Sequence, residues 1–131
     1  MNTRYPIPYD PPYVPIKNPT YHYSRSFCAP QGEKLYLVFE GVDSCFYVYV
    51  NGKFVGFSQI SHRMSEFDIT GYIVGGENRL DVLVQKWCTG TYFEDQDKWR
   101  FTGIFRDVYL LSRPAGHLVD YKIETSIFEK D

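Results

Sequence analysis

The residues best suited to chemistry lie in one short segment, YFEDQDKWR at positions 92–100, which we call the acidic loop. Glu94, Asp95 and Asp97 stand there beside aromatic side chains and an arginine. Carboxylate oxygens accept hydrogen bonds from hydroxyl groups, and aromatic rings cover apolar C–H faces, so this combination suits a sugar. A run of acidic residues is more often a solvated loop or a set of ion-pair residues, and the spacing alone leaves both interpretations open.

A catalytic centre is not indicated by these residues. The acid and base of a glycosidase face each other across the scissile bond, roughly 5 to 9 Å apart, which neighbours in one short loop do not do reliably. The 3 histidines show no HxH or HExxH pattern, and no serine lies in a G-x-S-x-G elbow. We therefore expect no catalytic residue in this chain.

The composition predicts one globular β domain. The chain has 131 residues, of which 44% are hydrophobic and 23% charged; a complete (β/α)₈ barrel needs roughly 200 or more. The 12 Tyr and 10 Phe favour strands over helices. The net charge of -2 has no basic block that would favour nucleic acid, and no apolar run approaches the roughly 20 residues of a membrane helix.

The cysteines and the N-terminus say little about the compartment. Cys28, Cys45 and Cys88 are far apart and odd in number, so we expect buried free thiols rather than a disulfide framework or a metal site. The first residues lead directly into a segment rich in proline and tyrosine, which is an unusual start for an independent fold. We expect a piece of a longer protein, whose location stays open: the cytoplasm is favoured, and the periplasm is possible.

The elements that must position the acidic loop are predicted to be strands. Residues 5–19, the proline arm, contain six prolines and should lie extended over a surface. Asn51-Gly52 between two β-rich runs predicts a hairpin with a type I′ turn. Strands are expected at 21–27, 35–39, 44–50, 53–58, 66–73 (a short strand or a turn), 79–87 and 104–111. Without any helical period, this pattern indicates a β-sandwich or jelly roll.

The pattern breaks at Pro114-Ala115-Gly116, and residues 117–124 begin a new alternating segment. We therefore expect a domain at 1–114 and a second unit starting within 115–131.

Several stretches, taken together and in order, carry a resemblance to a known family. They are Asn2 with 5–7, then 11–15, 18–20, 39–44, 51–56, 65–69, 76–80, 92–100 and 103–108. They resemble the sugar-binding domain of glycoside hydrolase family 2, and within it the large bacterial β-galactosidases. The resemblance covers nearly all of residues 2–114.

This resemblance implies an all-β, galactose-binding-like jelly-roll sandwich that lacks its first strand or strands. Such a domain packs against a (β/α)₈ barrel of the same parent chain, and residues 115–131 resemble the start of the immunoglobulin-like domain that follows. The barrel supplies the catalytic glutamates that hydrolyse terminal β-D-galactosides. The fragment alone is therefore expected to be inactive.

The family pattern also implies roles for two residues of this chain. Asn2 and Asp97 match residues that reach the galactose hydroxyls, and Asp97 also matches a sodium ligand. Magnesium belongs to the absent barrel, and no cofactor is expected in the isolated fragment. Support of the loop, by ion pairs and packing, is expected of Glu94, Asp95, Trp99 and Arg100.

Partners and alternatives follow from the same pattern. The expected partners are a β-galactoside and the parent's barrel, within a homo-oligomeric parent. The open edge of a truncated sandwich should favour self-association of the fragment. A free-standing carbohydrate-binding module, and a scaffold domain as in β-glucuronidases or β-mannosidases, stay open as other interpretations.

Overall fold

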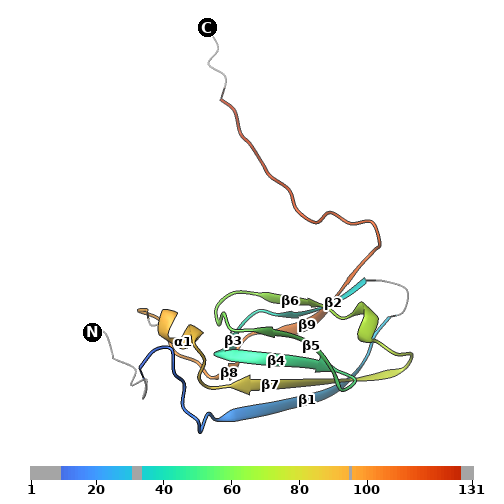
Figure 1. The fold of residues 1–131 in the computed structure, drawn as a ribbon. Coiled ribbons are helices and arrows are strands. Elements are labelled where there is room, and N and C mark those ends of the chain that lie inside the picture. The colour runs from blue at the N-terminus through green and yellow to red at the C-terminus, as the bar shows by residue number, and fades with distance from the viewer. Residues whose placement is uncertain (1–9, 31–33, 95, 128–131) are drawn as a thin grey trace.

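Antiparallel strands form the body of the computed structural model, which describes residues 10–30, 34–94 and 96–127. The elements are β1 (Thr20–Cys28), β2 (Lys34–Phe39), β3 (Val42–Asp43), β4 (Cys45–Val50), β5 (Lys53–Ser58), β6 (Ser65–Asp68), the single-turn 3₁₀ helix η1 (Thr70–Tyr72), β7 (Glu77–Gln85), α1 (Gly90–Phe93), β8 (Gly103–Ile104) and β9 (Val108–Arg113). A four-stranded sheet, β1-β7-β4-β5, and a three-stranded sheet, β6-β2-β9, form the two layers of a sandwich, and β3 pairs with β8 at one end (Figure 1). The predicted all-β sandwich is confirmed.

The core lies between the two main sheets. The rings of Phe39 on β2 and Phe46 on β4 have centroids 4.8 Å apart, and Phe67 on β6 packs edge-on against Phe46 at 5.9 Å. Val82 and Val84 of β7 face the same core and are almost fully buried. The alternation in residues 79–87 therefore correctly predicts that Val82 and Val84 lie on the apolar face of the four-stranded sheet.

The β4–β5 hairpin has the predicted turn. Asn51 has φ 52° and Gly52 has φ 75°, the positive values that a type I′ turn requires at both central positions. The Asn51 side chain also donates to the backbone oxygen of Tyr72 at 2.9 Å and accepts from the backbone N–H of Arg79 at 2.9 Å. The turn is thereby tied to η1 and to β7.

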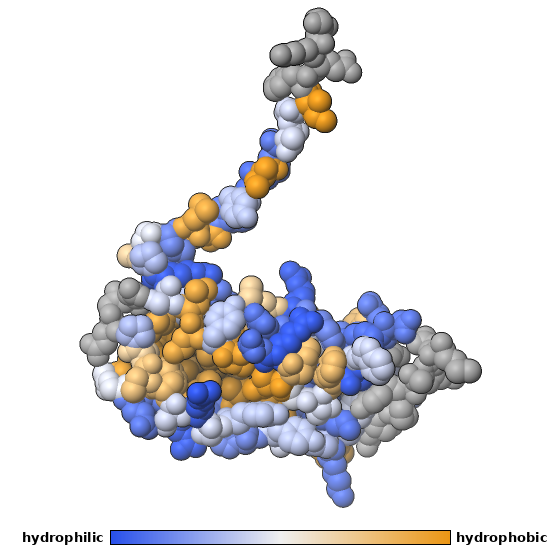
Figure 2. All heavy atoms as spheres, turned by 180° about the vertical axis from the view of Figure 1, so that it is seen from behind, coloured by the Kyte–Doolittle hydropathy of each residue, from blue (hydrophilic) through white to orange (hydrophobic). Residues whose placement is uncertain are grey.

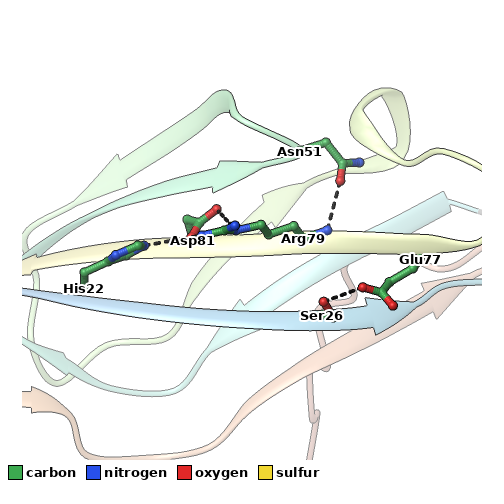
Figure 3. Close-up of polar contacts among 6 residues, drawn as sticks. All are labelled: His22, Ser26, Asn51, Glu77, Arg79 and Asp81. Atoms are coloured by element: carbon green, nitrogen blue, oxygen red, sulfur yellow. Dashed lines mark hydrogen bonds and ion pairs between the residues drawn. The ribbon is translucent and has the colours of Figure 1, made fainter.

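The outer face of β1 and β7 is polar, as the alternation of β1 predicts (Figure 3). His22 Nε2 lies 2.7 Å from Asp81 Oδ1, and Arg79 Nε donates to Asp81 Oδ2 at 2.9 Å. Ser26 donates to Glu77 at 2.7 Å. The bond from Arg79 is the main reason that the pKa of Asp81 is lowered, so this carboxylate stays charged on the solvated face.

One side of the sandwich is open. The four-stranded sheet has β1 at its edge, but among the described residues the three-stranded sheet ends at β9 and has no strand opposite β1. Tyr21 and Tyr23 share the face of Val84 and Val82, yet they are 46% and 40% exposed. A groove of about 610 Å³ results, the edge groove, and apolar side chains gather on the side that Figure 2 faces. Its lining includes Tyr23, Phe27, Leu37, Leu80, Val82, Tyr109 and Leu110.

Three elements differ from the sequence expectations. The strand expected at 104–111 is two strands, because Gly103, at φ 85°, and Ile104 pair with β3 before the chain joins β2 as β9. The loop after β7 contains the short helix α1. Described residues 114–127, which include the alternating segment, form no helix or strand and leave the body of the sandwich (Figure 1), because a ladder needs a partner strand.

Described residues 10–19 of the N-terminal arm form no strand, as predicted, and run to the start of β1. They are not extended throughout, because the Tyr13 N–H donates to the Asp10 oxygen at 3.0 Å and closes a turn. Among the described residues, no helix is long and apolar enough to cross a membrane.

Candidate functional site

The proline arm holds the base of the acidic loop. Asn18 at the end of the arm donates from its side chain to the backbone oxygen of Trp87 at 2.7 Å and accepts from the Trp87 N–H at 3.0 Å. Further along, the Tyr92 hydroxyl on α1 donates to the backbone oxygen of Tyr13. Two segments about 70 residues apart in sequence thus enclose the same end of the sandwich.

Glu94 fastens the loop to the body of the domain. Its Oε1 accepts from the Ser61 N–H at 2.9 Å, and its Oε2 accepts from the Ser61 hydroxyl at 2.6 Å. Lys98 Nζ lies 3.3 Å from the same Oε2, and both side chains are 20% exposed. Burial alone would raise the pKa of Glu94, but the Ser61 bonds and Lys98 outweigh it and lower that pKa. The expected supporting role of Glu94 is confirmed.

A second carboxyl group lies behind this contact. Asp43 on β3 is 8% exposed, and its Oδ1 is 3.3 Å from the Ser61 hydroxyl, which is fully buried. Burial raises the pKa of Asp43 and the nearby Glu94 carboxylate adds to this, against the opposing effects of Lys98 and of the hydrogen bond from Ser61. The Ser61 hydroxyl has one proton, so it donates either to Asp43 Oδ1 at 3.3 Å or to Glu94 Oε2 at 2.6 Å, and the shorter distance favours Glu94.

His62 and two phenylalanines complete this cluster. Lys98 Nζ lies 3.1 Å from His62 Nδ1, and since an ammonium group only donates, this nitrogen accepts. Burial first, and then the charge of Lys98, lower the pKa of His62 and favour its neutral form. Phe101 and Phe105 stack with centroids 4.7 Å apart, and His62 packs against Phe105 at 5.2 Å. Polar and aromatic contacts together hold both ends of the acidic loop.

Asp97 lies outside the contacts of this cluster. It is exposed, in the bend between Glu94 and Lys98, and the flanking aromatic side chains Phe93 and Trp99 are 80% and 84% exposed. An exposed acceptor carboxylate with exposed aromatic residues before and after it in the sequence is chemically suited to hydroxyl groups. The described part of the chain has no cluster of three or more residues that could hold a metal ion.

The structure brings only some of the sequence-predicted site residues together. Glu94 and Lys98 of the acidic loop meet, whereas Asn2 and Asp95 lie outside the described residues. Asp43, Ser61 and His62 were missed by sequence reasoning. No local signal marks them, because each is defined by a contact to a residue 18 to 36 positions away.

These features define a class of protein: a jelly-roll β-sandwich with an acidic, aromatic-flanked loop at one end, an architecture that also occurs in lectin domains. The family described as glycosyl hydrolases family 2, sugar binding domain, matches residues 1–114. The chain belongs to this family.

Two relatives show the similarity in sequence. The chain is 53% identical over 130 residues to a β-galactosidase of Staphylococcus xylosus and 55% identical over 124 residues to one of Actinobacillus pleuropneumoniae. These alignments cover 97% and 94% of this chain. They cover 13% and 12% of the relatives, so the chain spans about an eighth of their length.

Solved structures share the fold. A β-glucuronidase of Bacteroides uniformis matches with a TM-score of 0.66 at 29% identity, over 74% of this chain and 12% of its own. A putative β-galactosidase of Bacteroides fragilis matches with a TM-score of 0.65 at 25% identity, over 74% of this chain and 15% of its own. In both, the match is a small part of a much longer glycosidase chain.

Proposed function

We propose that this chain is a piece of a retaining β-galactosidase that hydrolyses terminal β-D-galactosides. The observation that carries the proposal is the identity of 53% and 55% to two β-galactosidases over nearly the whole chain. The catalytic acid/base and nucleophile belong to a barrel elsewhere in the parent. The present domain supports that barrel and contributes substrate contacts, and residues 115–131 begin the next domain.

Asp97 and Asn2 are the proposed substrate contacts. Asp97 is supported by its exposure beside Phe93 and Trp99 and by the anchoring of its loop through Glu94. Its carboxylate would accept from galactose hydroxyls, while the Asn2 amide would both donate and accept. The loop anchor matters here because a substrate contact is useful only when its position is held.

Asp97 is also the proposed ligand for a sodium ion. A carboxylate oxygen fits a hard cation, and Asp97 is exposed and therefore accessible. Because the described residues hold no three-ligand cluster, the other oxygens would come from elsewhere in the parent. Magnesium, by the same family resemblance, belongs to the barrel.

The test uses the full-length protein that contains this chain. We expect it to hydrolyse a chromogenic β-galactoside, and we expect Asp97→Asn to raise KM and to weaken the sodium dependence of KM. Asp120→Asn, a change of another exposed aspartate outside the loop, is the matched control. Unchanged KM and sodium dependence in the Asp97 variant would remove Asp97 from the site, and absence of β-galactosidase activity would overturn the function itself.

A second candidate is favoured by the structural neighbours. The β-glucuronidase fold match at a TM-score of 0.66 is consistent with a scaffold domain that makes no substrate contact. In that case the full-length protein would prefer a β-glucuronide, and Asp97→Asn would be neutral. The remaining alternative, a carbohydrate-binding module, requires that the isolated chain bind galactose or lactose at millimolar concentration or better, and we expect almost no binding.

The edge groove supports the proposed partners. Its walls, β1 and β9, are sheet edges, and Tyr23 and Tyr109 remain 40% and 39% exposed beside the open core. Exposed edges and apolar faces favour association, so the isolated chain should self-associate through β9 with a second copy. A strictly monomeric chain at high concentration in light scattering, with a cooperative melt at high temperature, would contradict this. The parent is proposed to be a homo-oligomer, which sedimentation of the full-length protein tests.

A further inference from the structure

Asp97 lies between two anchored residues of the acidic loop. Glu94, three residues before it, accepts from Ser61 at 2.9 and 2.6 Å. Lys98, the next residue, has its Nζ 3.3 Å from Glu94 Oε2 and 3.1 Å from His62 Nδ1. Consecutive Cα atoms are about 3.8 Å apart, so the place of Lys98 restricts Asp97 more closely than the place of Glu94 does.

The backbone around Asp97 is tightly folded. The Lys98 N–H donates to the Gln96 backbone oxygen at 2.9 Å, which makes Asp97 the central residue of a three-residue turn. The Gln96 N–H in turn donates to the Glu94 backbone oxygen at 2.8 Å. Because a turn this short has little slack, a shift of Lys98 displaces Asp97 with it.

His62 is well placed to hold Lys98. It follows the fully buried Ser61 in the connection from β5 to β6. Its ring packs against Phe105 and Phe101, with centroids 5.2 and 6.3 Å away, so packing fixes the direction of Nδ1. The Lys98 ammonium group reaches both this nitrogen and Glu94, and without the acceptor on His62 it would lose one of these two partners.

We propose that His62 is a positioning residue for substrate binding: its Nδ1 accepts from Lys98, and Lys98 thereby holds Asp97 where galactose hydroxyls and the sodium ion meet its carboxylate. The inference rests on the proposed function, because it takes Asp97 as the substrate contact. His62 itself touches neither substrate nor sodium. A contact of this kind is made equally to the bound substrate and to the transition state, so its loss raises KM and leaves kcat unchanged.

Two substitutions of His62 separate the acceptor from the ring in the full-length protein. His62→Phe keeps an aromatic ring beside Phe105 and removes the acceptor, whereas His62→Asn keeps an acceptor at the atom that corresponds to Nδ1 and removes the ring. We expect His62→Phe to raise KM for a chromogenic β-galactoside about two- to tenfold, the factor that one hydrogen bond is worth, and to raise the sodium concentration of half-maximal effect. His62→Asn should restore most of both losses, and kcat should stay within about twofold in each variant.

Two further substitutions complete the design. His22→Phe is the matched control, because His22 on β1 also meets a charged side chain, Asp81, at 2.7 Å, and this change should leave KM unaltered. Asp97→Ala removes the carboxylate itself. Adding His62→Phe to it should raise KM no further, because the effect of His62 passes through Asp97, whereas a general loss of packing would add to the effect of Asp97→Ala.

Three outcomes overturn this role of His62 while the proposed function stands. They are an unchanged KM and sodium dependence in His62→Phe when Asp97→Ala raises KM, an effect of His62→Asn as large as that of His62→Phe, and additive effects on KM in the double variant. A wild-type protein without β-galactosidase activity overturns the proposed function and the role of His62 together. A neutral Asp97→Ala in an active enzyme removes the substrate contact, and the role of His62 with it.

Discussion

The Glu94 anchor leads to a quantitative prediction for Glu94→Gln. The glutamine keeps the size of the side chain and one carbonyl oxygen, which can still accept one of the two Ser61 donors, at 2.9 or 2.6 Å. Its amide group then faces the other Ser61 donor or the Lys98 ammonium group, so donor meets donor. A lost hydrogen bond to a charged acceptor costs about 1.5–3 kcal/mol, and a partly exposed ion pair such as that to Lys98 adds at most about 1 kcal/mol.

We therefore expect Glu94→Gln to lower the free energy of unfolding by about 2–3 kcal/mol, or roughly 10 °C in Tm for a domain of this size. Urea denaturation of the 131-residue chain, followed by tryptophan fluorescence, measures it. Glu124→Gln is the matched control, since Glu124 also pairs with a lysine, Lys122, but the two side chains are 72% and 83% exposed. That change should stay within about 0.5 kcal/mol.

The lowered pKa of Glu94 also determines how the stability difference between the wild-type chain and Glu94→Gln changes with pH. The pKa of Glu94 is lowered by folding from its ordinary value of 4.5, so its contribution is fully present above that pH and is lost as the pH falls through the folded pKa. The gap between the wild-type chain and Glu94→Gln should therefore narrow in acid. Asp43, with its raised pKa, contributes in the opposite direction in both chains, but less in Glu94→Gln, because the Glu94 carboxylate is one cause of the raised pKa. A gap no larger than that of Glu124→Gln, or one that stays constant down to about pH 3, refutes the reasoning.

Three further changes are predicted to alter stability, each checked by urea denaturation or thermal melting. Gly103→Ala should cost about 2 kcal/mol, because φ is 85° and the new Cβ would collide with the Tyr23 hydroxyl, whereas Gly116→Ala, with open space around it, should be nearly neutral. Phe46→Ala should cost about 3–5 kcal/mol, since the ring is 1% exposed in the core; a loss below about 1 kcal/mol would show that the core is not packed as described. Asn78→Ala should cost about 3 kcal/mol or more, because this buried side chain makes hydrogen bonds at 2.8, 2.8, 3.0 and 3.1 Å that would be left unpaired; retention of wild-type stability would contradict these contacts.

Local patterns sufficed for the strands and the hairpin. The Asn51-Gly52 dipeptide needs only its own two residues to favour positive φ, and the alternation in 79–87 needs only its neighbours to divide an apolar face from a polar one. The family resemblance, carried by ordered stretches such as the acidic loop, identified the domain and nominated Asp97. Where the predicted strand 104–111 failed, the deciding factor was not local: β3 pairs with Gly103 and Ile104, whereas β2 pairs with residues 108–113.

The side-chain contacts around the acidic loop could be known only from the tertiary structure. Ser61 meets Glu94 across 33 residues, and Lys98 meets His62 across 36. Neither pair has a sequence signature, because the register of the strands and the path of the chain after Gln85 decide which side chains approach each other. Residue types in the sequence established what chemistry was available to this chain, carboxylates beside aromatic rings and free thiols. Only burial and the hydrogen bonds of the folded state distinguish the anchored Glu94 from the exposed Asp97.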